Sequence, residues 1–139
     1  MKTFLIACAC AALLGVAIPA AAHHSMAGFD RTKTTTVSGT VVQFKWANPH
    51  SWIEVAVTGD DGKTVNWNFE MTAPAYLVRA GWKSTSLKAG DKVTITGNPM
   101  VSGDPGALFV SVTLEDGTTL TQRAGGPPKG KGKGKGKGK

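Results

Sequence analysis

Residues 51–71 read SWIEVAVTGDDGKTVNWNFEM and contain two strand patterns separated by a turn. The first pattern, Ser51–Thr58, alternates apolar and other side chains, which is typical of a strand with one buried face. Gly59–Gly62 is typical of a hairpin turn. The second pattern alternates most cleanly, with an apolar face that would carry Val65, Trp67, Phe69 and Met71. The opposite face would carry Asn66, Asn68 and Glu70.

The residues on either side of this hairpin extend the β pattern and add one helix. We expect a long strand over Thr36–Trp46, with a bulge or sharp bend at Gly39, because glycine inside a strand often marks one. After the hairpin, Thr72 is expected to cap a short helix with Pro74 in its first turn. This helix would end at Gly81, since glycine is common just past a helix C-terminus.

The second half of the pattern predicts two more strands and a short third one. Ser86–Asp91 forms a turn into a fourth strand, Lys92–Gly97. A fifth strand is expected over Ala107–Leu114, followed by a short sixth strand through Leu120. The expected buried face of the fifth strand carries Leu108, Val110, Val112 and Leu114.

Three strands, one short helix and two further strands are the element order of the five-stranded OB barrel. Residues 36–122 are therefore predicted to form a mainly β, five- to six-stranded OB-like barrel, with the helix between the third and fourth strands. Closure would also remove exposed sheet edges. The alternative is an open β-sandwich, built from the same strands.

The N-terminal residues have the pattern of a secretory signal. Lys2 is the charged start, an apolar run covers residues 4–18, and Ala22 ends a small-residue cleavage site. We expect residues 1–22 to be removed, which leaves residues 23–35 as an N-terminal arm and places the protein in the periplasm. Cleavage one residue earlier, and lipidation at Cys8, are the two alternatives. Both cysteines lie in the leader, so the mature domain has no disulfide.

The net charge of +7 comes largely from the C-terminal tail, not from a basic face. Six of the 16 basic residues are the lysines of residues 129–139 and one lies in the leader, which leaves nine basic residues on residues 23–128 against all nine acidic residues. The tail, residues 123–139, is Gly/Pro-rich and then alternates Lys and Gly, which predicts disorder. It would bind an anionic membrane surface or lipopolysaccharide, or act only as a solubilising tail; nucleic acid is the least favoured partner.

All three histidines occupy special positions. Cleavage after Ala22 makes His23 the first residue, so its amine and imidazole together offer two nitrogen ligands. His50 follows Asn48-Pro49 and would supply a third nitrogen if the arm folds back. Three nitrogens suit Cu(II), and copper is favoured over zinc because the other donor offered is thioether sulfur. His24 and Met26 are auxiliary or alternative ligands.

Simpler interpretations exist for each of these residues. The histidine pair is also typical of a frayed terminus, and His50 of a hydrogen-bonded turn. Met71 is expected in the core. Glu54, Glu70 and Asp91 are interpreted as ordinary outward or turn acids, and no nucleophile motif or phosphate loop is present. A binding protein is therefore favoured over an enzyme.

The tryptophans allow a second function, in which the protein is an adaptor. Trp52 falls on the outward face of its strand, and OB barrels bind ligands across strands two and three. An exposed pair of Trp46 and Trp52, with Asn66 and Asn68 nearby, would stack on a saccharide or dock an envelope partner. The alternative is that most of the four tryptophans, Trp67 and Trp82 above all, belong to the core.

Several motifs in order resemble a family of small exported bacterial proteins of unknown function. They are the His23-His24-Ser25 start, Gly39-Thr40-Val41-Val42, Asn48-Pro49-His50-Ser51-Trp52, Gly81-Trp82 and Ser86-Leu87-Lys88-Ala89-Gly90-Asp91. The resemblance covers residues 23 to about 117 and leaves out the Lys-Gly tail. It implies a periplasmic location and a compact β domain, and it implies no activity or site residues.

Overall fold

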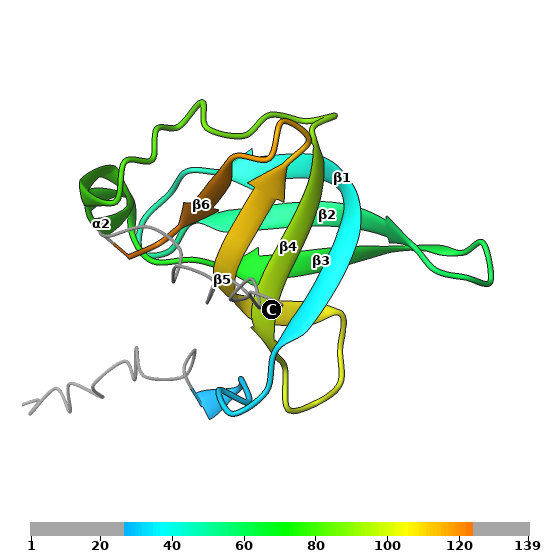
Figure 1. The fold of residues 1–139 in the computed structure, drawn as a ribbon. Coiled ribbons are helices and arrows are strands. Elements are labelled where there is room, and N and C mark those ends of the chain that lie inside the picture. Colours follow the sequence, from blue (N-terminus) through cyan, green and yellow to red (C-terminus); the bar gives the residue numbers. More distant parts are fainter. Residues whose placement is uncertain (1–26, 124–139) are drawn as a thin grey trace, which may run out of the picture.

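The computed structural model describes residues 27–123 of the chain. The predicted leader, the Lys-Gly tail and the candidate ligands His23, His24 and Met26 lie outside the described residues. The described elements, labelled in Figure 1, are β1 (Thr35–Lys45), β2 (Trp52–Thr58), β3 (Thr64–Glu70), α2 (Pro74–Arg79), β4 (Lys92–Pro99), β5 (Gly106–Leu114) and β6 (Thr119–Thr121).

The strands form one sheet that closes on itself. Its order is β3-β2-β1-β4-β5-β6, and β3 also pairs with β5 in parallel over Asn68–Glu70 and Gly106–Leu108. This parallel pairing closes a five-stranded barrel, to which β6 is added at the edge of β5. The predicted OB-like barrel is therefore confirmed, and the open sandwich is wrong.

The first strand is shared between two neighbours, as the barrel requires. Residues 35–40 of β1 pair with β4, and residues 40–45 pair with β2. The irregularity lies at Val42, because Val41 pairs with Val55 and Gln43 with Glu54. The bulge expected at Gly39 is therefore displaced. Gly39 instead allows a close strand approach, since a Cβ there would collide with the carbonyl oxygen of Ala56.

The buried face of β5 differs from the expected one in its first half. Ala107 and Phe109 are buried there, whereas Val110 is exposed. The register explains this, because Gly97 of β4 pairs with Phe109 and the preceding Thr96 pairs with Ser111. One extra residue on β5 therefore reverses which side chains point inward, and Val112 is buried after it.

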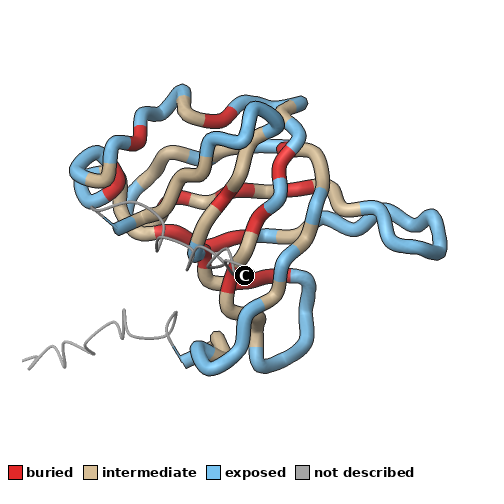
Figure 2. Tube along the Cα trace, in the orientation of Figure 1, coloured by how far each residue is buried: buried red, intermediate tan, exposed pale blue. Residues whose placement is uncertain are grey.

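The core lies inside the barrel and under the helix at one end. Figure 2 shows the buried residues along the strands and the exposed residues on the projecting β2–β3 hairpin. The largest buried side chain is Trp82, whose indole Nε1 donates to the Thr121 carbonyl over 2.7 Å. The core consists of Val41, Ile53, Val55, Phe69, Met71, Leu77, Trp82, Leu87, Val93, Ile95, Ala107, Phe109 and Val112.

The helix α2 begins with Pro74 and packs through Leu77. Ala73, not Thr72, occupies the cap position, and no side chain caps the helix. Thr72 continues the sheet instead, because its carbonyl accepts from Ser51 N–H and its own N–H donates to Gln122. Gly81 follows the helix with φ +90°, as expected of a C-terminal glycine. Among residues 27–123, no helix is long and apolar enough to cross a bilayer.

Candidate functional site

The loop between β1 and β2 places His50 against the end of β3. His50 Nδ1 lies 2.5 Å from Glu70 Oε1. The Glu70 side chain is 6% exposed and the His50 side chain 36% exposed, so solvent reaches the pair mainly from the histidine side. The two residues form the closest contact between titratable side chains in the described part of the chain.

The burial of Glu70 corrects the expectation that it is an ordinary outward acid. Its alternation is as predicted, because Glu70 pairs with Trp52 across β2 and β3 while the neighbouring Phe69 points into the core. It is nevertheless buried. It lies between two hollows and forms part of the wall of each. A buried carboxylate needs a partner, and His50 provides it.

The contact determines which nitrogen of His50 is available. A carboxylate only accepts hydrogen bonds, so Nδ1–H donates to Glu70, and a neutral ring then carries its lone pair on Nε2. No described side chain or backbone group donates to Nε2. A histidine held in this way by a carboxylate is the arrangement that metal-binding histidines use, because it orients the ring and makes its other nitrogen more basic.

The two hollows on either side of Glu70 differ in chemistry. One, of about 330 Å³, has both polar and apolar walls and is lined by Arg31, His50, Glu70, Met71, Thr72, Leu108 and Gln122. Gln122 is fixed there by two hydrogen bonds, to Thr72 N and to the Phe109 carbonyl. The other, of about 420 Å³, is mostly apolar and is lined by Gly28, Phe29, Trp52, Asn68, Glu70, Met100, Asp104, Pro105 and Gly106.

The N-terminal arm reaches the barrel beside this apolar hollow. Phe29 forms a bridge with Met100, and the Gly28 carbonyl accepts from Val101 N–H over 2.9 Å. Figure 1 shows the arm running next to the loop between β4 and β5. Asp30 stabilises the turn that follows: hydrogen bonds from Thr32 and Lys33 lower its pKa from the usual 3.8 to about 2. The described chain therefore starts at the wall of a hollow that contains Glu70.

The described residues bring together only part of the predicted metal site. His50 pairs with Glu70, and within residues 27–123 no three His, Cys, Asp or Glu side chains cluster as metal ligands would. Met71 is buried in the core, as expected. His23, His24 and Met26 lie outside the described residues, so their part in the site stays a prediction.

The predicted tryptophan face is formed only in part. Trp52 and Asn68 line both the apolar hollow and a smaller neighbouring one. Trp46 instead packs against the core, with its ring 5.6 Å from that of Phe44. The Asn66 amide donates to Glu54 Oε1 over 2.8 Å. The adaptor function through this face stays a prediction.

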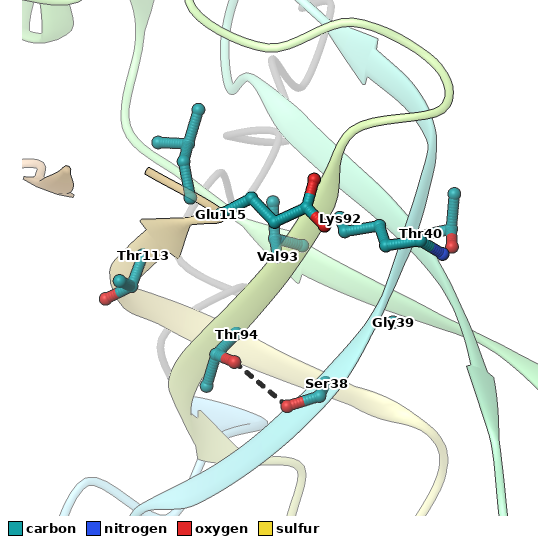
Figure 3. A pocket seen from close by; sticks show the side chains of 9 residues that line it. Ser38, Gly39, Thr40, Lys92, Val93, Thr94, Thr113 and Glu115 are labelled. Atoms are coloured by element: carbon teal, nitrogen blue, oxygen red, sulfur yellow. Dashed lines mark hydrogen bonds between the residues drawn. The ribbon is translucent and has the colours of Figure 1, made fainter. Parts of the chain in front are cut away.

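A third hollow lies across β1, β4 and β5, as Figure 3 shows. Its volume is about 390 Å³, and its hydroxyl groups include those of Ser38 and Thr94, which hydrogen-bond to each other over 2.9 Å. Lys92 and Glu115 lie on its rim with ordinary solvent exposure. It contains no buried titratable group among its lining residues, so the site at Glu70 is the stronger candidate.

Sequence reasoning missed Glu70, Arg31, Phe29 and Met100 as site residues. A signal for Glu70 was present, because the Gly59–Gly62 turn sets a register in which Trp52 lies opposite Glu70. His50 is two residues before Trp52, and its ring therefore comes near the end of β3. The other three residues come from the arm and the β4–β5 loop, whose paths follow from no local pattern.

Residues 11–109 match a family described as a family of unknown function, DUF6152. The match runs from the predicted leader into β5 and includes both His50 and Glu70. A comparison with curated proteins finds no match to the chain. The predicted resemblance to a family of unknown function is confirmed, and any functional conclusion must come from the site itself.

Proposed function

The chain belongs to the DUF6152 family, whose function is unknown, and we propose that it is an exported protein that binds Cu(II) through His23 and His50. On this proposal, signal peptidase cleaves after Ala22 and exposes the amine of His23. The amine and ring of His23 supply two nitrogen ligands, and His50 Nε2 supplies the third. Glu70 is not a ligand but orients the His50 ring.

The observation that carries the proposal is the contact between His50 Nδ1 and Glu70 Oε1. It holds the ring in one orientation and leaves Nε2 as the electron-pair donor on the more exposed side of the pair. The interpretation of His50 as a simple turn cap is therefore less favoured, because its partner lies on another strand and not in its own turn.

The path of the arm also supports the proposal. Gly28 and Glu70 line the same hollow, and Glu70 contacts His50, so the described arm begins beside the His50 pair. His23 is five residues before Gly28, and five residues span at most about 17 Å when extended. A terminal histidine thus has the reach to meet a ring on the same side of the barrel.

The nature of the donors favours copper. Amine and imidazole nitrogens suit the tetragonal sites of Cu(II), and divalent copper binds nitrogen sites more tightly than zinc does. His24 and Met26 are alternative ligands on the same short segment. The proposed role is binding of the ion in the periplasm, with no chemical reaction of a substrate.

Electron paramagnetic resonance of Cu(II) bound to protein that starts at His23 tests the proposal. Nitrogen coordination should be visible with one equivalent of copper. Adding one residue before His23 should change the spectrum, and His50→Ala should remove one nitrogen. Glu54→Gln, which alters a carboxylate hydrogen-bonded to Asn66 and not to His50, is the matched control and should leave the spectrum unchanged. An unaltered spectrum in both the extended protein and His50→Ala would overturn the proposal.

A further inference from the structure

The apolar hollow beside Glu70 has its own binding chemistry, separate from that of the His50 ring. It lies where the arm, the start of β2, the end of β3 and the β4–β5 loop meet. Its volume of about 420 Å³ is within the range of small-molecule sites. The arm and the β4–β5 loop are far apart in sequence but are joined beside the hollow by a β-bridge between Phe29 and Met100.

The walls of this hollow are aromatic or otherwise polarisable. Trp52 and Phe29 each contribute a half-buried ring, and Met100 adds a thioether. The Met100 side chain packs closely against Gly106, because a Cβ at Gly106 would lie only 2.8 Å from the Met100 sulfur. Aromatic faces carry a negative electrostatic potential and attract cations as well as apolar groups.

The charged groups of the hollow are all acidic. Glu70 lies at one side and Asp104 at the other, and its lining residues include no Lys, Arg or His. Asp104 is oriented by the Ser102 hydroxyl, which donates to its Oδ2 over 2.7 Å. One oxygen of Glu70 is in contact with His50 Nδ1, so Glu70 is shared between the hollow and the histidine.

We propose that this hollow binds a small organic cation, an ammonium group on a compact apolar body, between Trp52, Phe29 and the carboxylates of Glu70 and Asp104. Aromatic rings together with acids recognise ammonium groups by cation–π attraction and charge. A neutral apolar ligand would use the rings but not the acids. A saccharide would need more hydrogen-bonding groups than Asn68 and the two carboxylates provide.

The inference stands apart from the copper proposal. Trp52, Phe29 and Asp104 have no part in the proposed metal site, and only Glu70 is common to both. Metal-free protein, prepared with a chelator, therefore tests the hollow alone. Choline binding by a protein that fails to bind copper would leave this inference in place, and copper binding by a protein that fails to bind choline would leave the copper site in place.

The test compares choline with 3,3-dimethylbutan-1-ol, a neutral molecule of nearly the same shape. In two-dimensional ¹⁵N NMR, choline should shift the indole N–H signal of Trp52 and the amide of Gly106. The alcohol should bind about tenfold more weakly, since it lacks the charge. Equal affinity for the alcohol and choline would overturn the inference, because the acids would then have no effect.

Two variants separate binding from folding. Trp52→Ala should weaken choline binding by about tenfold or more. Asp104→Asn changes only an exposed loop side chain, should leave the fold intact, and should weaken binding several-fold. Glu115→Gln, which changes an exposed acid on the rim of the hollow across β1, β4 and β5, is the control and should bind choline like the parent protein. Full choline affinity in folded Asp104→Asn and in Trp52→Ala would refute the site.

Discussion

Replacing Glu70 tests whether the buried carboxylate controls the metal affinity of His50. Its contact with Nδ1 is short, at 2.5 Å, and its side chain is 6% exposed, so the hydrogen bond is charge-assisted and little screened. Such a bond contributes about 1.5–3 kcal/mol, which corresponds to about one to two powers of ten in an equilibrium constant. Loss of a carboxylate behind a metal-binding histidine has costs of the same size, about 10- to 100-fold in affinity.

Two substitutions at this position should differ in a defined order. Glu70→Gln keeps the shape and an accepting oxygen but loses the charge, so the Cu(II) affinity should fall about tenfold. Glu70→Ala also loses the acceptor and frees the ring, so the loss should approach about a hundredfold. Competition between the protein and a chromophoric chelator measures both constants at one fixed pH.

The matched control is Glu54→Gln. Glu54 is also a hydrogen-bonded acid on a strand, because its Oε1 accepts from Asn66, but its strand neighbours are Gln43 and Asn68 and not His50. Its substitution should leave the copper affinity within about twofold of the parent value. If the two Glu70 variants bind copper as tightly as Glu54→Gln, the carboxylate does not act on the metal and the reasoning fails.

Further predictions concern the fold and the arm. Val112→Ala truncates a fully buried side chain and should lower the free energy of unfolding, measured by urea titration, by about 2 kcal/mol. Val110→Ala, on the exposed face, should lower it by less than about 1 kcal/mol. Equal losses in the two variants would contradict the observed β5 register. Gly39→Ala should cost about 1–3 kcal/mol by strand collision, measured in the same way, and a neutral effect would be inconsistent with the close approach. The lowered pKa of Asp30 means that its ionised form is favoured in the folded arm, so its contribution is complete above the usual pKa of 3.8 and is lost as the pH falls through about 2. An NMR titration of the Asp30 carboxyl should therefore give a midpoint near 2, and a midpoint near 4 would show that the turn is not formed.

Much of the barrel follows from period-2 alternation and turn residues. The hairpin, the helix end at Gly81 and the start of β4 at Lys92 were predicted because each depends on neighbours in sequence. The predicted face of β5 was wrong in its first half, because one extra residue at Val110 reverses the alternation, and nothing in the apolar pattern marks it. The bulge of β1 was displaced from Gly39 to Val42 for a similar reason.

The candidate site was predictable to a smaller extent. His50 was identified by its position after Pro49, which is local information. The burial of Glu70 depends on the loop that carries His50 and on how the arm and the β4–β5 loop surround the end of β3, and these are long-range contacts. Trp46 was expected to be exposed together with Trp52, but it packs against Phe44 and the core.

The most direct test of the account is paramagnetic broadening by copper in protein that begins at His23. Cu(II) added in less than one equivalent should broaden the NMR signals of the N-terminal residues together with those of His50 and Glu70, since one ion joins the terminus to the turn. Signals of the β2–β3 hairpin around Gly62 should remain sharp. Broadening limited to the N-terminal residues, with His50 and Glu70 unaffected, would contradict the central claim that both histidines hold one ion.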